Sequence, residues 1–290
     1  MKVLGKTVQN SNNYWKIIKL KVQEQKIADA FALFRQNGIE PILIKGWATA
    51  LYYPRLEERI FADLDFCVKP EQYDLAVDIL KKNREGFQEI DLHKGFRHLD
   101  TLDWDDLFEN SRLKKVNAEE FRILRPEDHL RVICVHWLND GGASRERLWD
   151  IYYAVKNRPE NFNWERCLNL VDEERRFWVV CAIAAANRYL KLEIGDTPIK
   201  SEVMKIPYWL TKTIEREWQS DIQLLPLTDC LPDKKRFFQQ VFKRIPPNPI
   251  QATIECGGSF TENPRFYYQT LNLIQRGFKS GKKTFLKFEK

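Results

Sequence analysis

An alternating stretch that carries two acids constrains most strongly how this chain can fold. Residues 56–70 read LEERIFADLDFCVKP, and every second side chain from Ile60 to Val68 is apolar. Side chains of a strand point to opposite faces with a period of two, so the pattern predicts a strand over this span. Asp63 and Asp65 then project side by side from its other face, although Asp is uncommon in strands.

The spacing of these two acids is typical of a metal site. In a strand their Cα atoms would lie about 6–7 Å apart. Both carboxylates could then hold one divalent ion or a close pair of ions. The alternative interpretation is a half-exposed strand whose polar face carries two acids without a ligand.

Helix and strand patterns alternate around this stretch. Apolar residues at positions 27, 31 and 34 recur with the helical period, and Asn37-Gly38 is a typical helix end. Pro70 is placed as at the first position of a further helix, whose inward stripe is Tyr73, Ala76, Val77 and Leu80. The expected order is a helix over 22–36, a strand over 41–44, a short helix over 47–53, the acidic strand, the helix after Pro70 and a strand over 87–93.

The second part of the chain has helical patterns only. Residues 125–138 and 145–157 place apolar side chains at i, i+3, i+4 and i+7, and residues 164–192 and 201–219 are expected to be helical. The sequence therefore predicts an α+β protein. We expect a small mixed β-sheet core with helices on one face over residues 1–122, and a mainly helical region over 123–290.

Composition and cysteine spacing argue against several classes of protein, among them membrane-spanning, secreted and disulfide-bonded proteins. The chain is 43% hydrophobic and 30% charged, as in ordinary globular proteins. The longest apolar run, 177–186, is too short to cross a membrane and is expected to be a buried helix. No secretory signal is visible at the N-terminus. Six scattered cysteines without a C-x-x-C pair predict reduced thiols in a cytoplasmic protein.

The histidines and the C-terminal charge allow fewer conclusions. None of the histidines, at 93, 98, 129 and 136, has the i,i+4 spacing of a helical zinc pair, so each is expected to lie at the surface or in a hydrogen bond. The net charge is +6, and residues 276–290 carry six basic residues and one acid. This basic tail could attract nucleic acid or another polyanion, or it could be a solvated terminus.

Three features of the sequence, taken in chain order, together indicate one type of reaction. Lys45-Gly46 lies at a strand-to-helix turn, Asp63 and Asp65 lie on the next strand, and Asp91 lies on the third. A glycine at such a turn lets a phosphate approach the backbone, and a group of acids can hold metal ions. Phosphoryl or nucleotidyl transfer needs this combination, because it depends on positioning and on neutralising charge.

At these motifs the sequence resembles the polymerase-beta-like nucleotidyltransferase superfamily. It is most similar to a family of uncharacterised bacterial nucleotidyltransferases with an LLKG turn, an R-x-x-G-D-I-D strand and a later D-L-H. Here these motifs are LIKG (43–46), RIFADLD (59–65) and IDLH (90–93), and the resemblance covers residues 25–157. Trp47 stands where the superfamily usually has Gly or Ser, and Ala62 where the family commonly has Gly.

The resemblance implies a role for each matching residue. Asp63, Asp65 and Asp91 would be the catalytic acids and the metal ligands. Gly46 would lie at the nucleotide phosphates, with Lys45 and Arg59 as triphosphate contacts. Three alternatives stay open: Asp91 as a surface acid beside His93, Lys45 as a solvated turn lysine, and Arg59 in a structural pair with Glu57 or Glu58.

The implied function is that of a metal-dependent nucleotidyltransferase. Such an enzyme moves a nucleoside monophosphate from a nucleoside triphosphate such as ATP to a hydroxyl or phosphate acceptor and releases pyrophosphate. Its cofactor would be Mg²⁺ or Mn²⁺. The acceptor, whether a small molecule, a protein or RNA, stays open, and no membrane partner is expected. Two other functions remain: an RNA- or tRNA-directed nucleotidyltransferase, and a non-catalytic binding or regulatory protein that keeps the fold.

Overall fold

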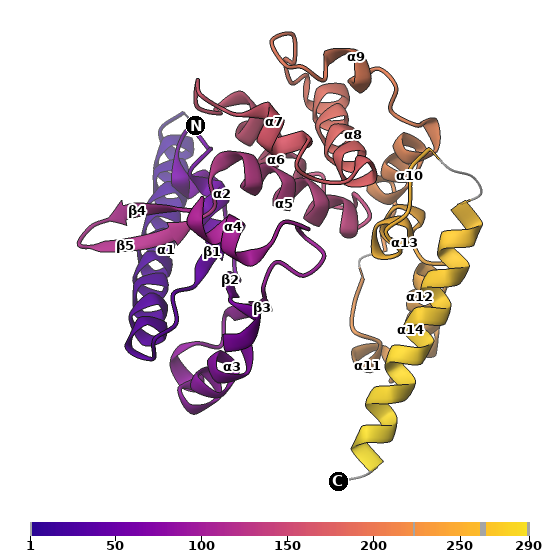
Figure 1. Ribbon diagram of the computed structural model, residues 1–290, viewed down its shortest axis with the longest axis horizontal. Coiled ribbons are helices and arrows are strands. Elements are labelled where there is room, and N and C mark those ends of the chain that lie inside the picture. The colour runs from indigo at the N-terminus through magenta and orange to yellow at the C-terminus, as the bar shows by residue number, and fades with distance from the viewer. Residues whose placement is uncertain (1, 223, 262–264, 289–290) are drawn as a thin grey trace. The chain divides into compact units, whose positions relative to one another are not determined.

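The computed structural model describes residues 2–222, 224–261 and 265–288, and the side chains of 14–222, 224–261 and 265–278 (Figure 1). The chain divides into two compact units. Unit 1 comprises Met1–Ile133 and Asp150–Val171, and unit 2 comprises Cys134–Trp149 and Asp172–Lys290. The domain boundary that the sequence suggests, between residues 122 and 123, stays a prediction.

Unit 1 is built on a five-stranded mixed sheet with the strand order β3-β2-β1-β5-β4. β1 pairs antiparallel with β2 and parallel with β5, β2 pairs parallel with β3, and β4 and β5 form an antiparallel hairpin. This sheet and the helices around it confirm the predicted α+β class. The strands are β1 (Ile42–Ile44), β2 (Leu64–Val68), β3 (Ile90–Lys94), β4 (Arg112–Val116) and β5 (Glu119–Ile123).

The acidic strand is shorter than the alternation predicts. β2 begins at Leu64, where the backbone N–H donates to the carbonyl of Glu89 at 2.9 Å, and the residues before it have no strand pairing. Ile60 is 56% exposed, whereas Phe61 is buried. The predicted assignment of these two residues to the apolar and polar face is therefore wrong, because the alternation holds only where the ladder exists. Asp63 lies just outside the strand and Asp65 lies within it.

Three helices of unit 1, α1, α2 and α3, pack on one face of the sheet. Phe31 and Phe34 of α1 contact Phe66 of β2, with ring centroids 5.4 and 5.8 Å apart, and Phe31 stacks on Phe121 of β5. α3 adds Ala76 and Ile79 to the same core. The helices here are α1 (Lys2–Gln36), α2 (Gly46–Ala50), α3 (Tyr73–Lys82), α4 (Trp104–Glu109) and α7 (Trp164–Leu168), with short 3-10 turns at Leu56–Glu58, Pro70–Gln72 and Arg84–Gly86.

A smaller apolar cluster lies on the opposite face of the sheet. Ile42, Ile44 and Cys67 point to this side and pack with Leu107 of α4 and Val132 of α5 (Pro126–Asn139). Side chains that alternate along β1 and β2 thus belong to two different cores. The acids of β2 and β3 share the face of the smaller cluster.

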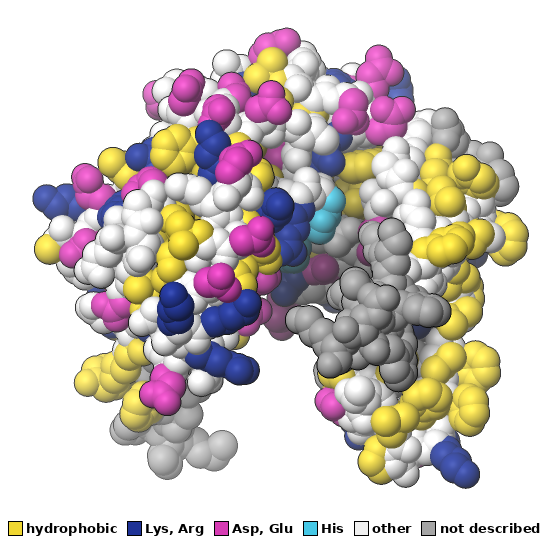
Figure 2. All heavy atoms as spheres, turned by 60° about the horizontal axis from the view of Figure 1, so that its bottom comes forward, with side chains coloured by type: hydrophobic (Ala, Val, Ile, Leu, Met, Phe, Trp, Pro, Cys, Tyr) yellow, Lys and Arg dark blue, Asp and Glu magenta, His cyan; other side chains and the backbone are white. Residues whose placement is uncertain are grey.

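Unit 2 is helical. α8 (Glu173–Leu190) is buried from Trp178 to Ala186, as expected for the apolar run, and no described helix is long and apolar enough to cross a membrane. Figure 2 shows hydrophobic side chains, in yellow, exposed at the surface. The exposed apolar residues of unit 2 include Phe238 and Phe242 of α12 and Phe266 and Phe278 of α14. Its other helices are α9 (Lys200–Val203), α10 (Tyr208–Trp218), α11 (Leu227–Cys230), α12 (Lys234–Arg244), α13 (Pro249–Glu255) and α14 (Arg265–Phe288), and α6 (Leu148–Lys156) crosses the division between the units.

The predicted basic tail falls on α14. Arg276 pairs with Glu255 at 3.1 Å. The other basic side chains of the tail, Lys279, Lys282, Lys283, Lys287 and Lys290, lie outside the described side chains. The two interpretations of the tail stay open.

A buried group of charges ties α5 to its neighbours in unit 1. The Arg131 side chain is fully buried and donates to Asp100 at 3.0 Å and to Asp128 at 2.7 Å. A third bond reaches the carbonyl of Arg166, and the Arg166 side chain pairs with Asp128 and Asp106. Each acid here has a cationic partner, which offsets the cost of removing it from water.

Replacing Arg131 by Met should therefore destabilise unit 1 strongly. The change leaves Asp100 without its described ion-pair partner in the interior, which typically costs about 3–5 kcal/mol. Lys81→Met is the matched control, because Lys81 is 70% exposed and its ion-pair partner among the described residues is exposed Asp78. Urea denaturation measures both variants. Equal and small losses of stability would contradict the role assigned to the buried group.

Candidate active site

The parallel pairing of β2 with β3 brings the predicted acids together. Asp65 is in register with Asp91, and Cys67 is in register with His93. Residues in register on neighbouring strands point to the same face. The sheet therefore places Asp65, Asp91 and His93 on one side, although they are up to 28 residues apart in the chain.

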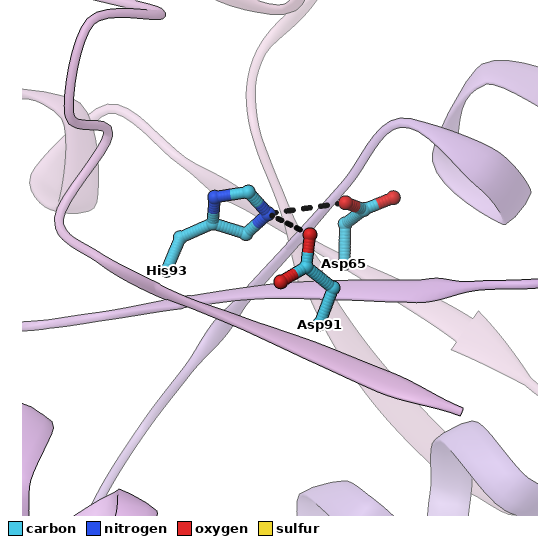
Figure 3. A group of neighbouring side chains, drawn as sticks. All are labelled: Asp65, Asp91 and His93. Carbon is cyan, nitrogen blue, oxygen red and sulfur yellow. Dashed lines mark hydrogen bonds and ion pairs between the residues drawn. The ribbon is translucent and has the colours of Figure 1, made fainter. Parts of the chain in front are cut away.

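These three side chains form a close group (Figure 3). His93 Nε2–H donates to Asp65 Oδ1 at 3.0 Å and lies 3.2 Å from Asp91 Oδ2, and one ligand atom from each residue lies within 4.8 Å of the others. Asp65 and His93 are buried, whereas the Asp91 side chain is 55% exposed. The group is thus buried at Asp65 and His93 and open to solvent at Asp91.

Lys45 adds a positive charge to this group. Its Nζ lies 2.5 Å from Asp65 Oδ1, and both side chains are nearly buried. Lys45 is therefore not a solvated turn lysine. Asp65 Oδ1 has a contact from Lys45 on one side and from His93 on the other, which is the kind of environment that a carboxylate needs when it is removed from water.

The neighbouring charges set the protonation of the three residues. Burial opposes ionisation of Asp65, but the hydrogen bond from His93 and the charge of Lys45 outweigh it and lower the pKa. The His93 hydrogen bond lowers the pKa of Asp91 to about 2. Burial lowers the pKa of His93, yet its bonds to both carboxylates prevail and raise it. The two acids are therefore held as carboxylates, and His93 contacts both of them.

Asp63 is not part of this group. It is exposed and precedes the first residue of β2, and the group of possible metal ligands found among the described residues contains Asp65, Asp91 and His93. The predicted metal role of Asp63 stays a prediction. His93, in contrast, was expected to be only a surface or hydrogen-bonding residue, although its period-two spacing from Asp91 places it on the same face.

The Lys45-Gly46 turn has an unusual backbone. Lys45 has φ 52° and ψ −146°, and Gly46 has φ 29°. A side chain at such a positive φ costs about 1–3 kcal/mol unless the surroundings impose it. Trp47 does not crowd the turn: its indole is buried, donates to Glu24 Oε1 at 3.2 Å and packs edge-on against Phe121.

His129 of α5 holds this turn in place. Its Nε2 accepts from the backbone N–H of Lys45 at 3.2 Å, and its Nδ1–H donates to the Tyr52 hydroxyl at 3.2 Å. Burial lowers the pKa of His129 to about 3, so the ring stays neutral and Nε2 remains an acceptor. The sequence alone gave no reason to connect residue 129 with residue 45.

Arg59 has a different partner from those expected. Its Nε and Nη2 donate to the two oxygens of Asp150 at 2.6 and 2.9 Å, and the Tyr53 hydroxyl also donates to Asp150. The alternative pairing with Glu57 or Glu58 is wrong, because Arg55 contacts both of those acids. Arg59 is thus fixed near the start of the acidic segment, and its triphosphate role stays a prediction.

The neutral state of His129 predicts how stability depends on pH. The unfolded-state pKa is about 6.5 and the folded-state pKa is about 3. Between these values the unfolded chain binds the extra proton, so the contribution of neutral His129 is complete above pH 6.5 and is lost as the pH falls towards 3, by up to about 1.4 kcal/mol per unit.

Denaturation of the wild type and of His129→Gln from pH 8 to pH 4.5 tests this. The wild type should lose more stability than the variant as the pH falls, so the difference between them shrinks. Parallel curves would mean that His129 does not titrate as its burial requires.

Comparison with known proteins gives one match. A family model described as an uncharacterised nucleotidyltransferase matches residues 17–190, which is more than half of the chain and contains every residue of the group around Asp65. No curated protein and no solved structure matches the chain significantly. The chain therefore belongs to a family of uncharacterised nucleotidyltransferases.

Proposed function

We propose that the protein is a metal-dependent nucleotidyltransferase that moves a nucleoside monophosphate from a nucleoside triphosphate to a hydroxyl or phosphate acceptor. The observation that carries this proposal is the group of Asp65, Asp91 and His93 beside Lys45 on the sheet. Family membership supports the reaction class.

The donor set fits a divalent cation. Two carboxylates and an imidazole offer ligand atoms within 4.8 Å of one another, and the proton on His93 Nε2 already lies between both acids. His93 Nδ1 is buried and has no hydrogen-bond partner within the described part of the chain. Mg²⁺ and Mn²⁺ prefer carboxylate oxygens, and the imidazole favours Mn²⁺ over Mg²⁺. When bound, such an ion would neutralise triphosphate charge and polarise the α-phosphate.

The residues around this group have separate roles in the proposal. Asp65 and Asp91 hold the cation, with Asp63 as a further acid that joins them when the nucleotide is bound. Lys45 and Gly46 lie at the triphosphate, where the Lys45 ammonium offsets negative charge. Arg59 is a weaker candidate for a phosphate contact, because both ends of its guanidinium fork already bind Asp150.

The proposed reaction exchanges a phosphoanhydride bond of the triphosphate for a phosphoester bond to a hydroxyl acceptor, or for a new phosphoanhydride bond to a phosphate acceptor. The acceptor oxygen forms a bond to the α-phosphorus, and the bond from that phosphorus to the oxygen bridging the β-phosphate breaks. Pyrophosphate leaves with the electron pair, and a hydroxyl acceptor loses its proton. With a pKa of about 2, Asp91 accepts a proton weakly, so we assign it mainly to ligand binding and less to proton removal.

Removing either carboxylate of the pair should stop the reaction. We expect Asp65→Asn and Asp91→Asn each to lower transfer from labelled triphosphate by at least about a hundredfold. Each change removes a negatively charged ligand of the proposed cation, which neutralises the triphosphate. Asp105→Asn is the control, since Asp105 is 70% exposed on α4 and, within the part of the chain that the structure describes, its ion pair is with exposed Lys69. Pyrophosphate release is measured with Mg²⁺ and with Mn²⁺. Full activity of both aspartate variants would refute the proposed metal site. If the wild type bound the triphosphate tightly without turnover, the result would favour a non-catalytic binding or regulatory protein.

Asp63 is tested by separating metal binding from turnover. Because it lies outside the group of three, Asp63→Asn should leave Mn²⁺ binding without nucleotide within about twofold of the wild type, whereas His93→Ala should weaken it at least about tenfold. If Asp63 completes the metal site when the nucleotide is bound, Asp63→Asn should nevertheless lose turnover. Calorimetry with Mn²⁺ alone gives the first quantity. Unchanged turnover would return Asp63 to the surface-acid interpretation.

A further inference from the structure

An open cavity lies beside the segment that leads into the acids. It has a volume of about 400 Å³ and is lined by side chains of α1 between residues 15 and 23, by Glu57 and by residues 59–61. The residues that define its chemistry are Trp15, Lys16, Lys19, Leu20, Ile60 and Phe61. Its size is in the lower part of the range of small-molecule sites, about 300–1,000 Å³.

The cavity combines an apolar floor with an exposed aromatic ring. Leu20 and Phe61 are buried beneath it, and Ile60 is 56% exposed at its edge. Trp15 is 64% exposed, which is unusual for the largest aromatic side chain. An exposed indole next to apolar surface is suited to stacking on a planar ring.

The cavity also has positive charge to spare. Lys16 and Lys19 lie one turn apart on α1, and neither has an ion pair among the residues that the structure describes. The other charged lining residues are already paired, Arg59 with Asp150 and Glu57 with Arg55. A ligand of this cavity would therefore meet two uncompensated ammonium groups, which favour a phosphate.

The position of the cavity connects it with the proposed reaction. Phe61 is two residues from Asp63 in the chain, and its ring lies 3.4 Å from where a side chain on Gly46 would begin. The Phe61 carbonyl is fixed to α1 by a hydrogen bond from Gln23 at 2.7 Å. The same short segment thus forms a wall of the cavity and borders the Lys45-Gly46 turn.

We propose that this cavity binds the acceptor of the transfer reaction, and that the acceptor is a nucleotide with a planar base and a phosphate. The proposal rests on the function proposed above. Trp15 stacks on the base, the floor of Leu20 and Phe61 accommodates the apolar face of the ligand, and Lys16 and Lys19 bind its phosphate.

The charges assign the cavity to the acceptor rather than to the donor. In the proposed function, the phosphates of the donor triphosphate are balanced by the cation that Asp65 and Asp91 would hold and by Lys45, so only the neutral base and ribose of the donor would reach the cavity. A neutral base does not need two lysines. Two unpaired ammonium groups therefore indicate a second ligand with a phosphate of its own.

Binding of adenosine 5′-monophosphate in EDTA tests the proposal, with the full-length protein and calorimetry. Lys16→Ala combined with Lys19→Ala should weaken binding by about tenfold or more, because charge-assisted bonds to the phosphate are lost. Trp15→Ala should weaken it at least about fivefold, and Trp15→Phe should restore most of the affinity. Adenosine without phosphate should bind more weakly than the monophosphate and should not respond to the lysine changes.

The matched control is Lys21→Ala combined with Lys26→Ala on the same helix, since these lysines pair with Glu24 and Glu89 instead. It should bind the monophosphate within about twofold of the wild type, as should Asp65→Asn combined with Asp91→Asn. The latter variant distinguishes the two proposals, because it should lose transfer and keep the monophosphate. No binding in EDTA, no effect of the two cavity lysines, or loss of binding in the aspartate variant would overturn the acceptor site.

Discussion

The structure of the candidate site depends on the charge balance around one buried carboxylate. Asp65 lies inside the sheet, where an isolated charge would be very costly. Lys45 reaches it from the turn after β1, and His93 reaches it from β3, at 2.5 and 3.0 Å. The two partners come from the strands on either side of β2, so the neighbouring strands β3, β2 and β1 each contribute one residue to the site. We infer that a divalent cation takes over part of this balance when the enzyme binds its nucleotide.

A second layer of contacts keeps those partners in place. Lys45 contacts Asp65 from a backbone with a positive φ, and neutral, buried His129 accepts the hydrogen bond from its N–H. His129 belongs to α5, which the buried Arg131 anchors to Asp100. The helical segment after the sheet therefore does more than cover the core. It determines the geometry of a turn that lies more than 80 residues earlier in the chain.

Much of the fold and part of the candidate site could be predicted from the sequence. The other features of the site depend on contacts between residues that are distant in the chain. Period-two alternation placed Asp91 and His93 on one face, and the continuous apolar run at 177–186 predicted a buried helix there. Alternation could not show that pairing starts at Leu64, since the ladder to β3 decides it. Nor could spacing identify His129, Asp150 as the partner of Arg59, or the inward rotation of Trp47. These depend on packing, for which a local pattern carries no signal.

The central claim is that Asp65, Asp91 and His93 form a cation site for the bound nucleotide. The most direct test is a crystal structure with Mn²⁺ and a non-hydrolysable triphosphate analogue, with anomalous diffraction collected at the manganese edge. The account predicts an anomalous peak within about 2.0–2.5 Å of Asp65 and Asp91 oxygens and close to His93 Nε2, with the triphosphate on the side of Lys45. A manganese peak bound elsewhere, with the Lys45–Asp65 pair intact beside a bound triphosphate, would contradict it.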